Sequence, residues 1–149
     1  MKLISVCITM LVVALATQEV RAAKDGWLTD FEAAKAEAAK RGLPILADFS
    51  GSDWCSWCVK LDKEVLSTDA FKAYAKENFV LFLADFPQAK PQPSATRKQN
   101  EALAKRYGVR GFPTVLLLEA DGKELARTGY QRGGAAGYIK HLKALIPDA

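Results

Sequence analysis

The sequence of 149 residues has few side chains that bind metal ions. It contains three cysteines, one histidine and two methionines, and both methionines lie within its first ten residues. A structural zinc site needs four Cys or His ligands, and beyond the N-terminal segment only Cys55, Cys58 and His141 are available. A c-type haem requires a histidine directly after the second cysteine of a pair, where this chain has Val59. We therefore expect neither a metal centre nor any other cofactor.

Clusters of positive charge are also absent. The formal net charge is +4, and the lysines and arginines are interspersed with acidic residues. Proteins that bind nucleic acids or anionic membranes gather their basic residues into patches or stripes. We therefore expect no nucleic-acid partner.

The only long apolar run lies at the N-terminus. A basic start is followed by an apolar stretch over residues 3–17 and by a segment that ends in Ala22. This run is too short to span a membrane, and the pattern is typical of a secretory signal peptide. We predict a signal peptide over residues 1–22 and one domain over residues 23–149, and hence a periplasmic or secreted protein. Gln18, Glu19 and Arg21 make the region before the cleavage site more polar than usual, so a retained N-terminal membrane anchor is the alternative.

Two cysteines remain once Cys7 is removed with the signal peptide. They lie in residues 45–60, which read as an apolar strand, a polar turn and a helix whose first turn carries Cys55 and Cys58. Residues three apart share a helix face, and the helix N-terminus stabilises a thiolate on the first sulfur. Asp53 is placed to cap this helix. The arrangement indicates a dithiol redox site; the alternative is a structural disulfide, although so short a loop removes little entropy from the unfolded chain.

The remaining pattern alternates helices and strands. A capping box formed by Thr29 and Glu32 predicts a helix that runs to Arg41 and stops at Gly42. Apolar or alternating runs predict strands at residues 44–49, 79–84, 115–119 and 124–128. Helices are predicted at residues 55–66, 69–78, 95–107 and 137–146.

A proline-rich segment separates the second predicted strand from the next helix. Residues 87–94 contain three prolines, which can continue neither a strand nor a helix. We predict an exposed loop. It is either a tolerated insertion or a loop that contacts a partner beside the active site.

The order of these elements, together with two motifs, resembles the thioredoxin superfamily. The motifs are Trp54-Cys55-Ser56-Trp57-Cys58 and Gly111-Phe112-Pro113-Thr114. The resemblance covers nearly all of residues 23–149 and is strongest to exported bacterial thioredoxin-like proteins and thiol:disulfide interchange domains. It implies an α/β thioredoxin fold, with a central mixed β-sheet flanked by helices on both faces.

The resemblance also implies roles for four residues. Cys55 would be the attacking nucleophile and Cys58 the resolving thiol, so that the two cycle through a Cys55–Cys58 disulfide. Pro113 looks like the family's cis-proline, which lies against the disulfide. The backbone of the preceding residue, Phe112, would then pair with an extended segment of the substrate.

Asp48 resembles the family's buried acid, which assists proton transfer at the resolving thiol. The turn before Cys55 is one residue longer than in ordinary thioredoxins. The lysine that often pairs with this acid is replaced by an apolar residue on the next strand, which we place at Leu81. An unpaired buried carboxylate is driven toward its neutral form. A structural hydrogen-bonding role for Asp48 is the alternative.

Two tryptophans flank the predicted disulfide. We expect Trp54 to provide a flat apolar surface beside the reactive thiol for binding substrates. Trp57 can do the same or can pack under the proline-rich loop.

These features predict an exported thiol:disulfide oxidoreductase that acts in the reductase or isomerase direction. Its partners would be substrate proteins with disulfides and an upstream thiol reductant, either soluble or membrane-bound, and we expect it to act as a monomer. The alternative function is a periplasmic Cu(I) carrier, since a surface dithiol can hold Cu(I). Such carriers usually add a histidine or methionine, and His141 is the only such residue outside the signal peptide. A non-catalytic binding module is disfavoured by the two intact cysteines.

Overall fold

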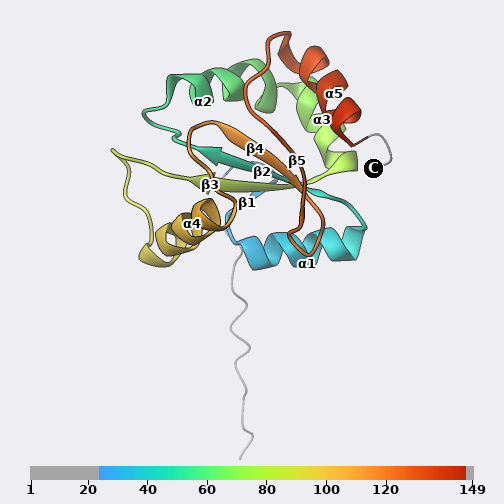
Figure 1. The fold of residues 1–149 in the computed structure, drawn as a ribbon. Coiled ribbons are helices and arrows are strands. Elements are labelled where there is room, and N and C mark those ends of the chain that lie inside the picture. The colour runs from blue at the N-terminus through green and yellow to red at the C-terminus, as the bar shows by residue number, and fades with distance from the viewer. Residues whose placement is uncertain (1–23, 147–149) are drawn as a thin grey trace, which may run out of the picture.

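A five-stranded sheet forms the centre of the protein (Figure 1). The computed structural model describes residues 24–146, so the predicted signal peptide lies outside it. In spatial order the strands are β1 (Trp27–Leu28), β3 (Val80–Asp85), β2 (Ile45–Ser50), β4 (Thr114–Leu118) and β5 (Glu124–Thr128). β1 and β2 run parallel to β3, whereas β4 is antiparallel to both β2 and β5. The mixed sheet implied by the resemblance is therefore confirmed.

Helices cover both faces of this sheet. One face carries α1 (Phe31–Arg41) and α4 (Ser94–Arg106). The other carries α2 (Ser56–Leu61), the π-helical turn η1 (Asp62–Leu66), α3 (Asp69–Asn78) and α5 (Gly134–Leu145). None of the helices within residues 24–146 is long and apolar enough to cross a membrane.

The alternation of side chains along β2 divides the core into two layers. Ile45, Ala47 and Phe49 belong to the cluster under α1 and α4, and Leu46 belongs to the cluster under α3 and α5. Because successive side chains of a strand point to opposite faces, Asp48 lies on the same face as Leu46. The buried carboxyl group therefore faces the layer that contains the cysteine helix.

Local signals explain most helix boundaries. Helix α1 ends at Gly42, which has φ 65°, as predicted. Its N-cap is Asp30, whose carboxylate accepts a hydrogen bond of 2.9 Å from the amide of Ala33. The predicted capping box is thus wrong in register, and Glu32 forms an ion pair with Lys35.

The cysteine helix is less regular than predicted. It begins at Ser56, and its last turn is the π-helical η1. The amide of Ser67 donates to the carbonyl of Asp62 at 2.8 Å, and its hydroxyl donates to the Asp62 carboxylate. Thr68, the next residue, caps α3, and its hydroxyl accepts a hydrogen bond of 3.3 Å from the amide of Phe71.

Candidate active site

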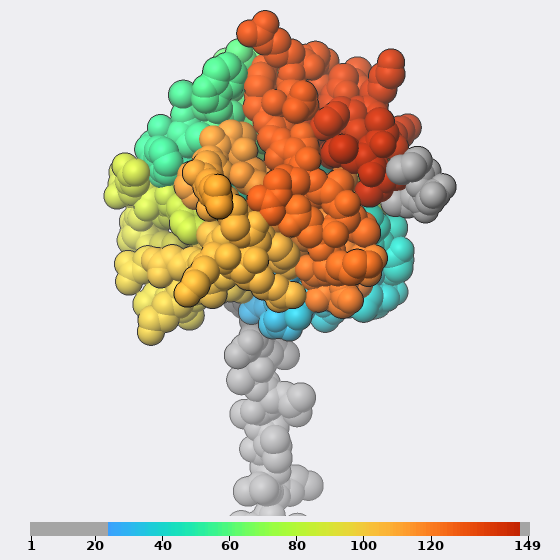
Figure 2. Space-filling view, viewed as in Figure 1, coloured from blue at the N-terminus to red at the C-terminus, as the bar shows by residue number. Residues whose placement is uncertain are grey.

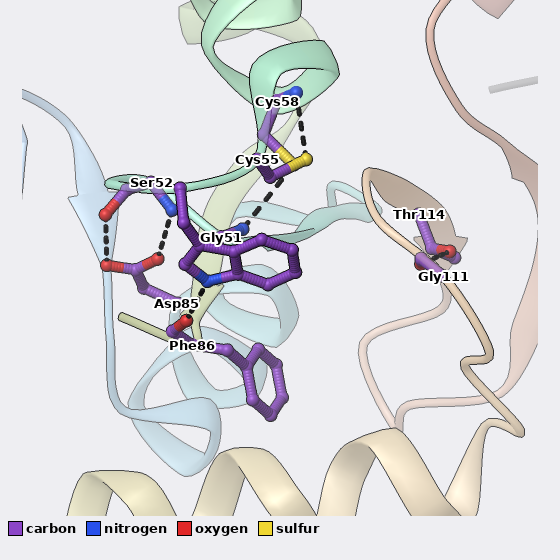
Figure 3. The surroundings of a disulfide bond; sticks show 9 residues. Gly51, Ser52, Cys55, Cys58, Asp85, Phe86, Gly111 and Thr114 are labelled. Carbon is purple, nitrogen blue, oxygen red and sulfur yellow. Dashed lines mark hydrogen bonds between the residues drawn. A yellow bond between two sulfur atoms is a disulfide. The ribbon is translucent and has the colours of Figure 1, made fainter. Parts of the chain in front are cut away.

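Cys55 and Cys58 are joined by a disulfide at the junction of β2 and α2 (Figure 3). Their Cα atoms are 5.2 Å apart. Cys55 is the N-cap residue of α2, and its Sγ accepts a hydrogen bond of 3.2 Å from the amide of Cys58. The amide of Gly51 donates to the Cys58 Sγ at 3.5 Å. Backbone donors thus face both sulfurs, and they favour negative charge on either one after reduction.

The loop before β4 faces the two cysteines (Figure 3). The Phe112–Pro113 peptide bond is cis, as the resemblance implied. Thr114 pairs with Phe49 near the end of β2, which brings Pro113 to the same edge of the sheet as the cysteine turn. The hydroxyl of Thr114 donates to the carbonyl of Gly111 at 2.7 Å and holds this loop in shape.

Aromatic side chains border the disulfide on one side. Trp54 is 44% exposed, and its ring meets Phe112 edge-on with the centroids 5.8 Å apart. Phe112 also packs on Phe86, at 5.0 Å between centroids. The indole Nε1 of Trp54 donates to the carbonyl of Phe86 at 2.7 Å. We call Trp54, Phe86 and Phe112 the aromatic rim.

Trp57 lies apart from the aromatic rim. It is 51% exposed and packs on Tyr130, with 5.2 Å between ring centroids. The ammonium group of Lys60 lies 5.2 Å from the Trp57 ring centroid. The hypothesis that Trp57 packs under the proline-rich loop is therefore wrong, and Trp54 makes the contact with the start of that loop.

Asp48 is buried without a complete set of partners. It lies on β2 between Leu83 of β3 and Val115 of β4, and it is 6% exposed. Among the described residues, no group hydrogen-bonds to its Oδ1. Burial raises the pKa of Asp48 to about 7, with the charge of Lys24 acting in the opposite direction. A carboxyl with this pKa exchanges its proton near neutral pH.

Lys24 supplies the positive charge near this acid. Its ammonium group donates a hydrogen bond to the carboxylate of Asp62. Its backbone forms an isolated antiparallel β-bridge with Trp27, the first residue of β1. The residue directly opposite Asp48 on β3 is Leu83, whereas Leu81 pairs with Leu46, two residues earlier on the same face of the sheet. Sequence reasoning missed Lys24 because it stands outside every motif, before a strand of only two residues.

Asp48 and Cys58 line the same cleft, of about 740 Å³. Its walls come from residues before β1, from η1, from the ends of β2 and β3 and from the start of α4. Polar lining residues include Lys24, Ser50, Ser52, Asp62, Asp85 and Asn100. The buried acid and the second cysteine therefore border one and the same cleft.

Asp53 does not cap α2 as predicted, since Cys55 occupies that position. Its carboxylate accepts hydrogen bonds from the amides of Gln88, Ala89 and Lys90 at 3.0, 2.8 and 3.0 Å. These bonds, that from Gln88 foremost, lower the pKa of Asp53. The sequence could not reveal this contact because its two sides lie 35 to 37 residues apart.

The described residues provide no cluster of metal ligands. Within residues 24–146, no group of three or more His, Cys, Asp or Glu side chains is placed to hold a metal ion. His141 is half-buried, and its Nε2 lies 2.8 Å from the hydroxyl of Thr128.

Comparison with known proteins gives consistent matches. A family model described as a thioredoxin-like domain matches residues 31–145. The chain is 36% identical over 130 residues to the disulfide bond reductase DsbH of Chlamydia pneumoniae, covering 87% of this chain and 78% of DsbH. It is 32% identical over 121 residues to the thiol:disulfide interchange protein DsbD of Yersinia enterocolitica, covering 79% of this chain but 19% of DsbD.

Solved structures agree with these matches. The structure of a DsbH oxidoreductase superposes with a TM-score of 0.74 at 36% identity, covering 78% of this chain and 81% of that one. A thioredoxin from Thermus thermophilus, at 23% identity and a TM-score of 0.59, shares the fold and covers 80% of this chain and 85% of its own. With the cysteine pair, the cis-proline and the strand order in place, the chain belongs to the thioredoxin-like domain family.

Proposed function

We propose that this protein is an exported thiol:disulfide oxidoreductase that acts on the disulfides of other proteins in the reductase or isomerase direction. The observation that carries the proposal is the Cys55–Cys58 disulfide beside the cis Phe112–Pro113 bond, bordered by exposed aromatic rings. The names of DsbH, a disulfide bond reductase, and DsbD, a thiol:disulfide interchange protein, support it.

The reaction begins with the reduced dithiol. The Cys55 thiolate attacks one sulfur of a substrate disulfide, the substrate S–S bond breaks, and a mixed disulfide forms while one substrate thiolate leaves. The Cys58 thiolate then attacks the Cys55 Sγ. The second substrate thiolate leaves, and the Cys55–Cys58 disulfide closes, so two electrons pass from the protein to the substrate.

The second step needs a base for the Cys58 thiol. Asp48 shares the cleft with Cys58, and burial raises the pKa of Asp48 to about 7. A carboxylate with that pKa can take a proton near neutral pH and later return it. We assign Asp48 this acid–base role, acting through water in the cleft.

Substrate binding falls to the loop before β4 and to the neighbouring rings. An extended substrate segment would pair with the backbone of Phe112, next to Pro113, and would lie against Trp54 and Trp57.

The oxidised protein must regain two electrons after each turnover. The partner that supplies them is an upstream thiol reductant, soluble or membrane-bound, and the protein acts as a monomer.

Reduction of insulin with dithiothreitol as the electron source tests the function. The wild type should accelerate reduction at least tenfold over the uncatalysed rate, and Cys55→Ser should lose this acceleration. A Cu(I) titration on the same samples addresses the alternative function. A protein that fails to reduce insulin and binds Cu(I) tightly would be a metal carrier.

Export has a separate test. If residues 1–22 are a signal peptide, mass spectrometry of the exported protein should find a chain that begins at Ala23. A chain that begins at Met1 in the membrane fraction would instead identify an anchored protein.

A further inference from the structure

The active-site turn, residues 51–54, is hydrogen-bonded to the end of β3 and to the loop that follows it, residues 86–93. At one end the carboxylate of Asp85, the last residue of β3, accepts hydrogen bonds from the amide and hydroxyl of Ser52 at 2.9 and 2.6 Å (Figure 3). At the other end the indole of Trp54 donates to the carbonyl of Phe86 at 2.7 Å. The start of the loop is thus fixed against the residues that precede Cys55.

The middle of the loop depends on Asp53. Its carboxylate accepts hydrogen bonds from three consecutive amides, those of Gln88, Ala89 and Lys90. These three residues are exposed, and in Figure 2 the yellow-green segment around them stands at the edge of the molecule beside the green cysteine helix. The side chains of the loop tip are exposed, and its amides are held by Asp53; farther along the loop, the side-chain amide of Gln92 donates to the carbonyl of Asp85 at 3.0 Å.

The loop also supports the aromatic rim. Phe86 packs on Phe112 at 5.0 Å, and Phe112 meets the ring of Trp54 at 5.8 Å. Trp54 is further fixed by Gly51, since a side chain there would come within 2.4 Å of the indole. The turn, the rim and the loop therefore form one continuous surface on the Trp54 side of the disulfide.

We propose that Asp53 is a positioning residue that holds residues 86–93 as part of the docking surface for protein substrates, and so sets the preference for protein disulfides over small ones. This inference rests on the proposed oxidoreductase function. A small disulfide needs access only to the Cys55 sulfur. A protein chain that lies along Phe112 also extends across the aromatic rim and onto the loop.

Steady-state kinetics with insulin and with glutathione disulfide test the proposal. In Asp53→Ala the ratio of kcat/KM for insulin to kcat/KM for glutathione disulfide should fall at least fivefold. The loss should appear in KM for insulin rather than in kcat. The matched control is Asp121→Ala, because Asp121 is an exposed carboxylate that also accepts a backbone bond, from Lys123 at 2.8 Å, but lies at the opposite end of β4. That control should leave the ratio unchanged.

A second variant separates position from charge, since Asp53 lies only two residues before Cys55. Ala89→Pro removes one of the three donors and keeps the carboxylate. It should also raise KM for insulin, while the pH dependence of Cys55 alkylation stays as in the wild type. If only Asp53→Ala lowers the ratio and it also shifts that alkylation profile, the effect is one of charge and the proposal is overturned.

Hydrogen exchange reports on the contact without reference to activity. The amides of residues 88–90 should exchange at least tenfold faster in Asp53→Ala. Faster exchange with an unchanged substrate ratio would overturn the docking role. A wild type that reduces neither substrate would overturn the proposed function itself, which the exchange data would distinguish from a failure of the Asp53 contact.

Discussion

The two cysteines are both buried, at 7% and 4% exposure, but their surroundings differ. Cys55 begins α2 and lies beside the exposed Trp54, whereas Cys58 is within the helix and lines the cleft that contains Asp48. A thiolate at the start of a helix is stabilised by the amides and dipole of that helix. The reactive thiol is therefore expected at Cys55.

Alkylation of the reduced protein checks this assignment. At neutral pH, iodoacetamide should label Cys55 at least tenfold faster than Cys58, as read by peptide mass spectrometry. Cys58→Ser should keep the reactive thiol and accumulate mixed disulfides with substrates, and Cys55→Ser should accumulate none. Faster labelling of Cys58 would reverse the two roles.

Asp48 should make the stability of the protein depend on pH. Its folded-state pKa of about 7 lies above the ordinary value of 3.8 because burial disfavours the charged form. Between these values the folded protein holds the proton more tightly than the unfolded chain, so this carboxyl lowers stability as the pH rises from about 4 to 7. Removing the charge with Asp48→Asn should therefore stabilise the oxidised protein at pH 8, by at most roughly 4 kcal/mol, and much less at pH 4.

Urea unfolding of the oxidised protein at the two pH values measures this difference. The exposed Asp121 provides the control, since Asp121→Asn removes a charge that is not buried. A gain for Asp48→Asn that is equal at pH 4 and pH 8 would show that its carboxyl does not titrate in this window.

The motifs and the family resemblance predicted the disulfide and the cis-proline beside it, but contacts of residues outside the motifs and of Asp53 with the loop were missed. The disulfide of Cys55 and Cys58 and the cis bond before Pro113 were expected from short, specific patterns. Lys24 reaches the surroundings of Asp48 only because β1 pairs with β3. Asp53 reaches the loop only because β2 and β3 end at the same edge of the sheet.

At the level of elements, sequence patterns located α3, α4 and the central strands to within about one residue, but they missed β1 and the start of α5. β1 has two residues, too few to show a period, and α5 begins at Gly134, where glycines argue against a helix. The π-helical turn η1 follows from contacts of Ser67 with Asp62 that no periodicity displays. The strands were correct to about one residue because β2 and β4 lie in the core, and their apolar runs report burial.

The cap of α1 gives a test at this scale. Asp30→Ala removes the acceptor for the Ala33 amide and should lower the free energy of unfolding by about 1 kcal/mol. Glu32→Ala should cost less than about 0.5 kcal/mol, because Glu32 is exposed and contacts only Lys35 among the ion pairs of the described residues. Denaturant unfolding of both variants at pH 7 would compare them. A larger loss for Glu32→Ala would restore the capping box that the sequence predicted.

At the scale of the whole molecule, the fold brings three separate segments to one edge of the sheet. These are the cysteine turn after β2, the loop after β3 and the cis-proline loop before β4. They adjoin β2, β3 and β4, and β2 is hydrogen-bonded to both β3 and β4, so the sheet register fixes their relative positions. The fold thus provides a rigid support for the disulfide and leaves substrate preference to side chains on the connecting loops.

The redox potential depends on charges that this architecture brings near Cys55. Ser56 and Trp57, between the cysteines, carry no positive charge, and Asp53 places a carboxylate two residues before Cys55. Lys60 is engaged with Glu64, at 3.8 Å, and with the Trp57 ring. The thiolate is therefore stabilised chiefly by backbone amides, and the disulfide should not be strongly oxidising.

We expect a potential of roughly −270 to −180 mV, between those of thioredoxin and protein disulfide isomerase. Equilibration with glutathione redox buffers, read by alkylation and mass spectrometry, measures it. The comparison variant is Trp57→His. It adds a cationic side chain between the cysteines and should make the potential less negative by stabilising the reduced form. A wild-type redox potential of about −120 mV would identify a disulfide donor instead. In the expected range the dithiol persists in an oxidising compartment only if another thiol protein reduces it, so the measured potential also decides whether an upstream reductant is required.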